Sequence, residues 1–589
     1  MKFIKKILFL LSPREIKSVI YLLVIMVIMA FLEIVGIVSI LPFITVLSNP
    51  SLIETNTILN LIYKASSVIG VENHRHFLIV LGAIVLILLV ISLSFKAFTI
   101  YLQVRFNEMR IFSISKNLLE RYLHQPYSWF LSRNSADFSK TILSEVEKVV
   151  GNGISPLLNI ISQGMVTIAI ITLLAIINPI LTLIITFLFG FAYLGIYKFS
   201  KIFIHQIGEQ NLEYNLARFL STSEAFGAIK QVKVTGSEQI YLDRFSLAAY
   251  KYSKTNTYIG IISALPRYAI EITTFSIIIF IILILMSKTD NFNDILPIIS
   301  VYVYAGYRLI PAFQVLYGSL AKITFGMPSL NKLCDDLKNI ERFDLKEYKN
   351  KVPLNTTITL ENIYYNYPNQ TKSVLENLSL TIPVKTKVGI IGTTGSGKTT
   401  IVDIILGLLE PQKGILKIDN QIINQKNIKA WTQSLGYVPQ NIYLADDTIA
   451  ANIAFGVDQK KINKDQLTKV SKIANLHDFI TQELPKKYQT IVGERGVRLS
   501  GGQCQRIGIA RALYHNPKVL IFDEATSALD KETEKSVMDA IRNISEDITI
   551  IMIAHRLNTL KDCDTIFKFE NGKLVSEENF DQMMKKNSN

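Results

Sequence analysis

A glycine-rich segment at residues 392–400 has the composition of a phosphate-binding loop, and it follows the apolar run 387–391. Glycines let the backbone curl so that several N–H groups and the start of a helix face a phosphate. The lysine of such a loop reaches the β- and γ-phosphates, and the next hydroxyl can hold Mg²⁺. The pattern predicts nucleotide binding, with Lys398 in catalysis and Thr399 at the metal. The predicted nucleotide contacts are Gly392, Thr393, Thr394, Gly395, Ser396, Gly397, Lys398, Thr399 and Thr400.

Two adjacent carboxylates follow a second apolar run at residues 518–522. Asp523 is suited to holding Mg²⁺, directly or through water, and Glu524 to orienting and deprotonating an attacking water. A phosphate-binding loop alone indicates only nucleotide binding. The loop and the carboxylates together predict hydrolysis of ATP.

Residues 499–503 read Leu-Ser-Gly-Gly-Gln and open an arginine-containing segment with a helical pattern. A glycine-flanked helix start offers N–H groups and a positive dipole to a phosphate. The segment resembles the signature motif of the ATP-binding cassette (ABC) family. In that family the phosphate belongs to ATP held by a second cassette, so the resemblance implies that two cassettes act face to face. It assigns nucleotide contacts to Ser500, Gly501, Gly502 and Gln503.

Further family motifs follow in the same order along the chain. By resemblance, Tyr367 stacks on adenine, Gln440 contacts the nucleotide and senses Mg²⁺, and His555 bonds the γ-phosphate in catalysis. Residues 527–530 resemble the loop that crosses the dimer interface. Residues 492–496 resemble the loop that touches coupling helices of the membrane domain.

The hydrolytic residues of the family are intact here, so the resemblance implies that both sites of a homodimer hydrolyse ATP. One departure is Cys504, where a basic residue is common after the signature, and we expect little effect from it because it lies beyond the phosphate-binding groups. An ATP-regulated channel would need a hydrolysis-poor site, which Glu524 contradicts.

The elements that must position these residues fall into two parts. The chain has 589 residues, more than one core usually holds. Its mean hydropathy is +0.31 although 19% of its residues are charged, and the apolar excess lies before about residue 325. We expect a multi-domain membrane protein. Its predicted parts are a six-helix transmembrane domain of the exporter fold over 1–325, a linker over 326–350 and an α/β P-loop ABC ATPase domain over 351–589.

Six apolar stretches are long enough to cross a membrane as helices. They are residues 19–47, 77–102, 156–177, 180–199, 258–286 and 295–314. Two long basic connections, after the second and fourth stretches, predict that these connections, both termini and the ATPase are cytoplasmic. By resemblance, coupling helices lie near 126–133 and 227–236. The net charge of +14 is explained by such loops, and no nucleic-acid module is expected.

Two segments outside the spans have an amphipathic pattern. The start of the chain, residues 1–15, has a basic head and a short apolar run, which predicts a cytoplasmic helix at the membrane surface. Residues 50–68 are external by the predicted topology and read as an amphipathic helix, half-sunk in the outer leaflet or capping the bundle.

Charged residues inside the spans are candidates for cargo binding, because they usually face a bundle interior or a wet cavity. The candidates are Arg267, Arg308 and Glu33. The alternative is mutual neutralisation, since Arg267 could pair with Glu271 four residues on. Lys96 lies near a helix end, where it can extend to the membrane surface.

Three membrane fragments resemble bacterial lipid-linked oligosaccharide flippases, which serve protein N-glycosylation and related pathways. They are FLEIVGIVSILPFITVL, SALPRYAIE and YRLIPAF. The resemblance implies flipping of a polyprenyl-pyrophosphate glycan across a bacterial inner membrane by a homodimer, with ATP and Mg²⁺ as cofactors. Arginines in a central cavity would suit a pyrophosphate. The alternatives are a general lipid or hydrophobic-drug exporter and a peptide exporter. Dedicated peptide exporters often carry an N-terminal peptidase-like domain, for which there is no room before residue 19.

Overall fold

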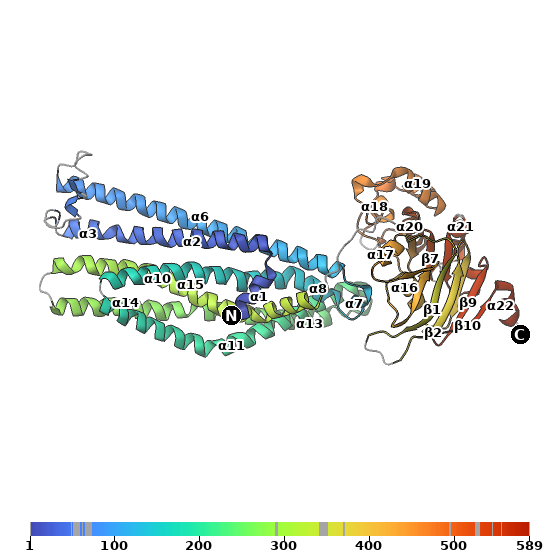
Figure 1. Ribbon diagram of the computed structural model, residues 1–589, viewed down its shortest axis with the longest axis horizontal. Helices are drawn as coiled ribbons and strands as arrows, with labels where there is room; N and C mark the ends of the chain where they lie inside the picture. Colours follow the sequence, from blue (N-terminus) through green and yellow to red (C-terminus); the bar gives the residue numbers. More distant parts are fainter. Residues whose placement is uncertain are drawn as a thin grey trace. The chain divides into compact units, whose positions relative to one another are not determined.

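The computed structural model describes most of the chain. The described residues are 2–48, 50, 53, 59–61, 63–64, 73–177, 179–288, 292–340, 352–368, 372–493, 496–524, 531–542, 544, 546–554 and 556–587. They form two compact units, each treated separately (Figure 1). We call Met1–Gln125 with Arg133–Phe343 the helical unit, and Pro126–Ser132 with Asp344–Asn589 the α/β unit.

The helical unit is a bundle of long helices (Figure 1). Its elements are α1 (Lys2–Leu10), α2 (Pro13–Val38), α3 (Ile40–Ser48), α6 (His74–Leu123), α8 (Ser135–Lys140), η1 (Thr141–Glu145), α9 (Val146–Val149), η2 (Val150–Ile154), α10 (Ser155–Ile177), α11 (Pro179–Gly227), α12 (Ile229–Thr235), α13 (Glu238–Ala264), α14 (Pro266–Lys288) and α15 (Phe292–Asn339). The segments η1 and η2 are π-helical. Such segments carry an extra residue in a turn and occur often at functional sites.

The start of α2 shows how the sequence sets a helix end. Ser12 caps the helix by accepting a hydrogen bond from the Glu15 N–H, while Glu15 accepts one from the Ser12 N–H, and Pro13 fills the first turn. Glu15 also forms an ion pair with Arg110 of α6. The first helix, α1, packs on α15, where Lys6 Nζ lies 2.6 Å from Asn331 Oδ1.

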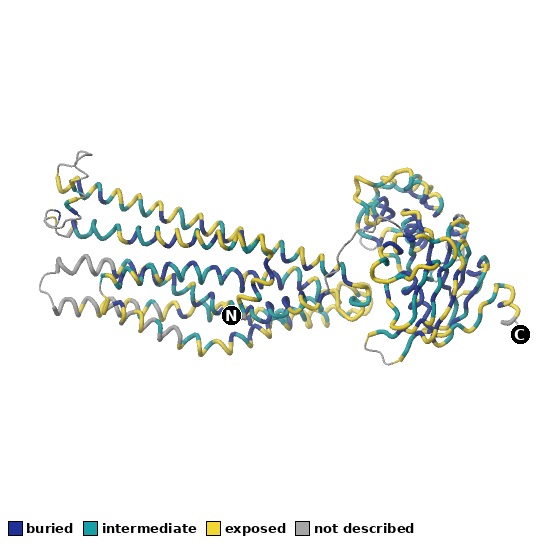
Figure 2. Tube along the Cα trace, in the orientation of Figure 1, coloured by how far each residue is buried: buried dark blue, intermediate teal, exposed yellow. Residues whose placement is uncertain are grey.

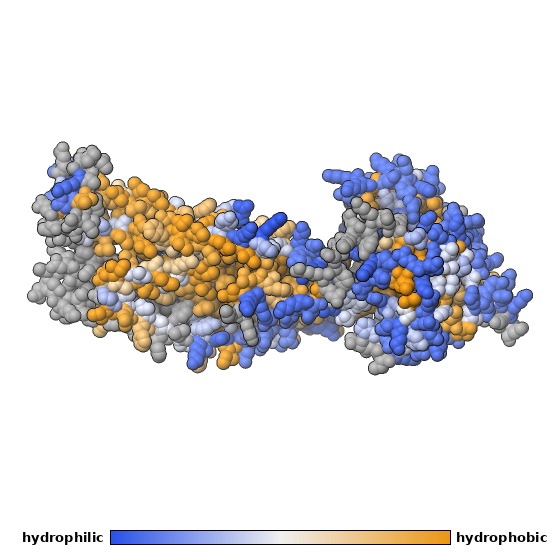
Figure 3. Space-filling view, in the orientation of Figure 1, coloured by the Kyte–Doolittle hydropathy of each residue, from blue (hydrophilic) through white to orange (hydrophobic). Residues whose placement is uncertain are grey.

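Three helical ranges are long and apolar enough to cross a membrane when the described residues are searched. They are Pro13–Leu47, His74–Leu123 and Ser135–Ile177. The remaining predicted spans fall on α11, on α13 with α14, and on α15, so the count of six stays a prediction. Figure 3 shows that the visible face of the helical unit is largely apolar along its middle, whereas that of the α/β unit is largely hydrophilic.

Two predicted element boundaries differ from the structure. The fifth predicted span, 258–286, falls on two helices, since α13 ends at Ala264 and α14 begins at Pro266, because a proline lacks the N–H that would continue the helix. In contrast, α15 passes through Pro311 as one helix and runs to Asn339. The first part of the range expected as a linker, 326–350, is therefore helical.

The described residues of the external segment 50–68 lie against the bundle. Ile53 and Leu59 are buried in one apolar cluster with Val46, Phe77 and Leu81. This contact fits the capping alternative for those two residues, and most of the predicted amphipathic helix lies outside the described residues.

The α/β unit contains two sheets. The strands are β1 (Thr357–Tyr365), β2 (Leu375–Pro383), β3 (Lys387–Gly392), β4 (Lys413–Ile418), β5 (Gln421–Ile423), β6 (Leu435–Val438), β7 (Val519–Asp523), β8 (Thr549–Ile553), β9 (Thr565–Glu570) and β10 (Lys573–Glu578). A four-stranded antiparallel sheet has the order β2-β1-β4-β5. A six-stranded sheet has the order β10-β9-β3-β8-β7-β6, in which only β10 is antiparallel among the described strands.

The α/β unit also contains helical segments. They are α16 (Lys398–Ile405), α17 (Ile428–Thr432), α18 (Ile449–Ile453), η3 (Gln459–Lys461), α19 (Lys464–Ile473), η4 (Phe479–Glu483), η5 (Lys487–Gln489), α20 (Gly501–Tyr514), α21 (Lys531–Arg542), η7 (Leu557–Leu560) and α22 (Phe580–Asn587), with α7 (Tyr127–Leu131) from the same unit. Every residue of β7 and β8 is buried, so these central strands form the core (Figure 2). The predicted functional residues at the ends of β3 and β7 therefore stand on rigid elements.

Trp431 is the largest fully buried side chain described in the α/β unit, and its indole N–H donates a hydrogen bond of 2.7 Å to the Ile405 carbonyl. We expect Trp431→Ala to lower the stability of the unit by about 3–5 kcal/mol, since it leaves a large cavity. Thermal unfolding of the full chain in detergent would show a lower midpoint. Val575→Ala, at an exposed position on β10, is the control; equal midpoints for the two variants would contradict the prediction.

Candidate functional site

The glycine-rich loop joins the buried strand β3 to α16. Gly395 and Gly397 have φ values of +81° and +97°, a conformation that other residues rarely adopt. A Cβ at Gly397 would lie 2.7 Å from the Leu375 side chain, and one at Gly392 would lie 2.3 Å from the Phe569 carbonyl oxygen. The tight path of the loop therefore requires glycine at these positions.

Lys398 lies at the start of α16 and is buried. Its ammonium group donates hydrogen bonds to the carbonyls of Gly392 (2.9 Å) and Thr393 (3.0 Å), which holds the side chain across the loop. Burial lowers the pKa of Lys398, although the carboxylates of Glu524 and Asp523 act in the opposite direction. A cation is thus kept inside the loop and faces two carboxylates.

The donors in and around this loop fit a polyphosphate. Among the described residues the buried hydroxyl of Ser396 has no hydrogen-bond partner, and such a group needs one. Thr393, Thr394, Gly395 and Thr399 are exposed. Together with the N-terminus of α16 and the ammonium of Lys398, they place several donors and one positive charge at the same loop.

The two carboxylates stand at the end of β7. Burial raises the pKa of Asp523, and the adjacent charge of Glu524 adds to this effect. The Tyr437 hydroxyl, 3.3 Å from Asp523 Oδ2, donates a hydrogen bond that offsets part of it. Gln440 Nε2 donates to Glu524 Oε2 over 2.8 Å, so the structure brings the predicted metal residues Gln440 and Asp523 to the predicted base.

Glu524 has a left-handed backbone conformation, with φ +49°. This conformation costs about 1–3 kcal/mol in a residue other than glycine, and such strain is concentrated at functional sites. The Glu524 N–H donates to the Ile553 carbonyl on β8 over 3.1 Å. The strained turn directs the side chain to Gln440 rather than along the strand.

The predicted adenine contact, Tyr367, is half-buried. Its hydroxyl lies 3.1 Å from Thr400 Oγ1, and its ring packs edge-on against Tyr365 with centroids 5.2 Å apart. This hydrogen bond holds the Tyr367 ring next to the first turn of α16, which follows the phosphate loop. Stacking on adenine stays a prediction.

The signature residues form the start of α20. Ser500 caps the helix by accepting from the Gln503 N–H (3.2 Å), and Gln503 Oε1 accepts from the Ser500 N–H (2.8 Å). Gly501 is exposed, whereas Gly502 is buried. Within the part of the α/β unit that the structure describes, no hydrogen bond joins these residues to the phosphate loop. One bond does reach the neighbourhood, from Gln505 Nε2 to the Gln440 carbonyl (3.1 Å).

Some predicted functional residues lie outside the described residues. They are His555, the loop 527–530, and Glu494 and Arg495 within 492–496. Their predicted roles are untested by the structure.

Sequence analysis missed Asp403, an acid in the otherwise apolar α16. Burial raises its pKa to about 6, and the nearby charge of Asp523 contributes. The available signal was a single carboxylate within the otherwise apolar run Thr-Ile-Val-Asp-Ile-Ile, where an acid is unusual. The structure thus places a third acid beside the predicted metal residue.

Of the charges predicted to bind cargo, two meet in the helical unit. Glu33 of α2 is 4% exposed and lies 3.8 Å from Arg308 NH1 of α15. Lys96 of α6 approaches the same oxygen to 2.6 Å, and Arg308 NH2 donates to the Tyr304 hydroxyl over 3.2 Å. Lys96, expected to extend to the membrane surface, is instead paired inside the bundle.

The third predicted residue, Arg267, is not part of this cluster. Its Nε lies 2.6 Å from Glu271 Oε1 on the same helix, and half of its side chain is exposed. This is the pairing that sequence analysis gave as the alternative to cargo binding.

Both parts of the chain match families of known proteins. Residues 19–305 match the family described as ABC transporter transmembrane region, and residues 375–527 match the family described as ABC transporter. A relative from Saccharophagus degradans, named ATP-dependent lipid A-core flippase, is 31% identical over 80% of this chain and 79% of its own length. The chain is an ABC exporter half-transporter.

Other comparisons agree with this assignment. A relative from Wigglesworthia glossinidia brevipalpis with the same name is 30% identical over 81% of each chain. A solved structure, described as a bacterial Atm1-family ABC exporter with ATP bound, superposes with a TM-score of 0.79 over 97% of both chains. At 23% identity this likeness concerns the fold alone. The exporter is an ATPase whose hydrolysis is coupled to transport.

The half-buried acid Asp403 makes a pH-dependent stability prediction. Its pKa is raised from 3.8 to about 6, so the folded exporter binds this proton more tightly than the unfolded chain. The resulting stabilisation is present below pH 3.8 and is lost as the pH rises through about 6. At pH 7.5 the charged carboxylate destabilises the fold, and we expect Asp403→Asn to raise the midpoint of thermal unfolding by a few degrees.

This gain should shrink as the pH falls and vanish well below pH 3.8, where Asp403 is neutral in both the folded and the unfolded state. Thermal unfolding of the nucleotide-free exporter at several pH values measures it. The control is Glu546→Gln, an exposed acid of the same unit. A gain that does not depend on pH would contradict the assignment.

The predicted base is tested by Glu524→Gln. This change keeps an acceptor for Gln440 but removes the basic carboxylate, so ATP hydrolysis should fall at least about 100-fold while ATP binding persists. Phosphate release and the amount of retained nucleotide measure the two properties. Vigorous hydrolysis by the variant, alongside normal hydrolysis by Glu546→Gln, would assign the role to another residue.

Proposed function

We propose that the exporter flips a polyprenyl-pyrophosphate oligosaccharide from the cytoplasmic to the external leaflet of the inner membrane. The observation that carries this proposal is the cluster in which the half-buried cations Lys96 and Arg308 approach the buried carboxylate of Glu33. Two cations share one carboxylate, so the cluster holds an excess positive charge inside a bundle of apolar helices. A charge in that environment attracts an anion, and an arginine fork suits phosphate oxygens.

The role of Glu33 is refined by its burial. Only 4% of the residue is exposed, and Lys96 and Arg308 both approach its Oε1. We therefore assign it the positioning of these two cations rather than contact with the cargo. The names of the two relatives, as flippases of lipid A-core, support a lipid as the class of cargo.

The ATPase chemistry is proposed for Mg²⁺–ATP at composite sites of a homodimer. The loop N–H groups and Lys398 hold the β- and γ-phosphates, and Thr399, Asp523 and Gln440 hold the metal. Glu524 takes the proton of the attacking water, and Ser500–Gln503 of a second copy complete the site. The ATPase domain and both termini are placed in the cytoplasm by the basic connections.

A general lipid or hydrophobic-drug exporter is the second candidate. The pairing of Arg267 with Glu271 favours it, because a paired, half-exposed arginine is not reserved for a phosphate. The third candidate, peptide export, has no structural observation in its favour.

Arg308→Ala and Arg267→Ala separate the candidates. In liposomes that contain the exporter, ATP and a polyprenyl-pyrophosphate oligosaccharide, we expect Arg308→Ala to reduce the lipid moved per ATP hydrolysed about tenfold or more, since one charge-assisted contact is lost. A smaller loss is expected for Arg267→Ala, since its charge is already paired. Leaflet transfer is measured by the accessibility of the glycan to an added lectin.

The control is Arg244→Ala, an exposed arginine of α13. Transport of the pyrophosphate lipid by Arg308→Ala at the rate of this control would favour the general lipid exporter. Transport of an uncharged lipid by the native protein at the rate of the pyrophosphate lipid would also favour the general lipid exporter.

A further inference from the structure

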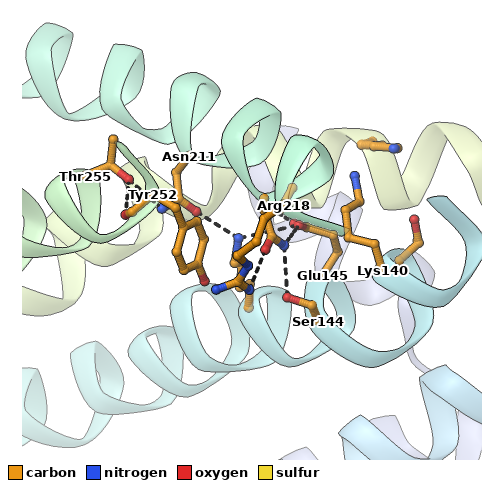
Figure 4. Close-up of polar contacts among 12 residues, drawn as sticks. Lys140, Ser144, Glu145, Asn211, Arg218, Tyr252 and Thr255 are labelled. Carbon is orange, nitrogen blue, oxygen red and sulfur yellow. Dashed lines mark hydrogen bonds and ion pairs between the residues drawn. The ribbon is translucent and has the colours of Figure 1, made fainter. Parts of the chain in front are cut away.

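A second buried acid, Glu145, lies at the centre of a polar network in the helical unit (Figure 4). It is 1% exposed. Its Oε1 accepts from Asn215 Nδ2 (2.7 Å) and lies 3.4 Å from Lys148 Nζ, and its Oε2 accepts from the Ser329 hydroxyl (2.6 Å). Both oxygens of the carboxylate are therefore committed to donors from three different helical segments.

The network extends from this acid through two buried asparagines of α11. Asn215 also donates to Ser144 Oγ (3.0 Å) and accepts from Arg218 (2.8 Å). Asn211 accepts from Lys148 Nζ (2.8 Å) and donates to Thr255 Oγ1 of α13 (2.7 Å). In both asparagines, the side-chain Nδ2 and Oδ1 atoms therefore have hydrogen-bond partners within the helical unit.

An aromatic ring of α13 completes the network. The Arg218 guanidinium carbon lies 4.2 Å from the centroid of the Tyr252 ring, and Lys148 Nζ lies 4.8 Å from it. Two cations, from α11 and α9, are thus held by the same ring through cation–π contacts. Figure 4 shows the side chains of η1, α11 and α13 converging on this point.

The connected helices carry both predicted coupling segments. In the sequence, helix α7 connects α6 to the α8–η1–α9 run that bears Glu145, and α7 belongs to the α/β unit. Helix α12 lies between α11 and α13, which bear the asparagines and Tyr252. The third helix, α15, supplies Ser329 and leads into the chain that enters the α/β unit. Two of the connections between the units, from α7 into the α8–η1–α9 run and from α15 onward, therefore lead directly to segments that carry this network.

Close backbone contacts lie one turn from the network. A Cβ at Gly208 of α11 would stand 2.4 Å from the Phe325 carbonyl oxygen of α15, and one at Gly326 would stand 2.8 Å from Asn152 of η2. These contacts leave no room for the helices to slide by small steps. A polar network with fixed partners likewise is either formed or broken, because a partly satisfied buried charge is costly.

We propose that Glu145 is a positioning residue for coupling, which makes the α7-bearing and α12-bearing helices respond to ATP as one body. Loss of the carboxylate separates the responses of the two coupling segments and leaves the ATP site itself intact. The inference concerns the transport cycle and not the cargo, so it does not depend on the proposed lipid.

Full-length Glu145→Ala and Glu145→Gln in nanodiscs test this proposal. Hydrogen exchange of peptides from α8–η2 and from α11–α13 is compared with and without ATP plus vanadate. In the native exporter both groups of peptides should change. In Glu145→Ala the ATP-dependent change in exchange of the α11–α13 peptides should fall to less than about a third of its native size. The KM for ATP should stay within about twofold of the native value. A merely structural defect would alter exchange without ATP in both groups.

Glu145→Gln keeps the shape and one acceptor oxygen, so its response should fall between those of the native protein and the alanine variant. Glu147→Gln, at an exposed position two residues on, is the matched control and should behave as the native exporter. If Glu145→Ala does not fold, Glu145→Gln and Ser329→Ala decide the question. If Glu145→Ala shows the native ATP-dependent change in exchange in both peptide groups, or a KM for ATP changed about tenfold, the proposal is overturned.

Discussion

A carboxylate buried among apolar helices must be surrounded by donors, because an unpaired charge there costs more free energy than one packing contact contributes. Among its described residues the helical unit contains two such acids, and each joins separate helices. Glu33 joins α2 to α6 and α15, and Glu145 joins η1 to α11 and α15. Both clusters include α15, so this helix is the element through which charge in one cluster can affect the other.

The α/β unit relies on a different constraint, which is the geometry of the backbone. Gly392 and Gly397 are fixed by neighbouring atoms that leave no space for a side chain, and Glu524 is held in a strained conformation. These positions stand at or just after the ends of β3 and β7, the two strands that flank β8 in the six-stranded sheet, so the cation of Lys398 and the carboxylates of Asp523 and Glu524 stay close together without a ligand to gather them.

Local patterns predicted the elements of the α/β unit well, because the residues of each motif themselves determine the local backbone conformation. The glycine spacing predicted the loop, and the apolar runs predicted β3 and β7 as strands that end at functional residues. The Ser-Gly-Gly-Gln sequence predicted the helix start that Ser500 caps. The exporter fold followed from these motifs and the spans together.

Pairings between distant residues could not be predicted in the same way. Lys96 and Glu33 are 63 positions apart, and nothing in either neighbourhood indicates the other. Asp403 reads as one polar residue in an apolar helix until Asp523 is seen beside it. The break before Pro266 was open to prediction, whereas Pro311 lies within a continuous helix, because the effect of a proline depends on how its neighbours satisfy the freed carbonyl.

Because α15 is one continuous helix, a rotation at one of its ends displaces residues at the other. Arg308 and Ser329 stand on the same rod, separated by about 30 Å at 1.5 Å per residue. A rotation of about 4° around the Ser329 end would carry Arg308 through about 2 Å, by that geometry. Such a displacement exceeds the difference between the present Arg308–Glu33 separation of 3.8 Å and a hydrogen-bonded ion pair, so a small angular change at one end would tighten or break this pair at the other.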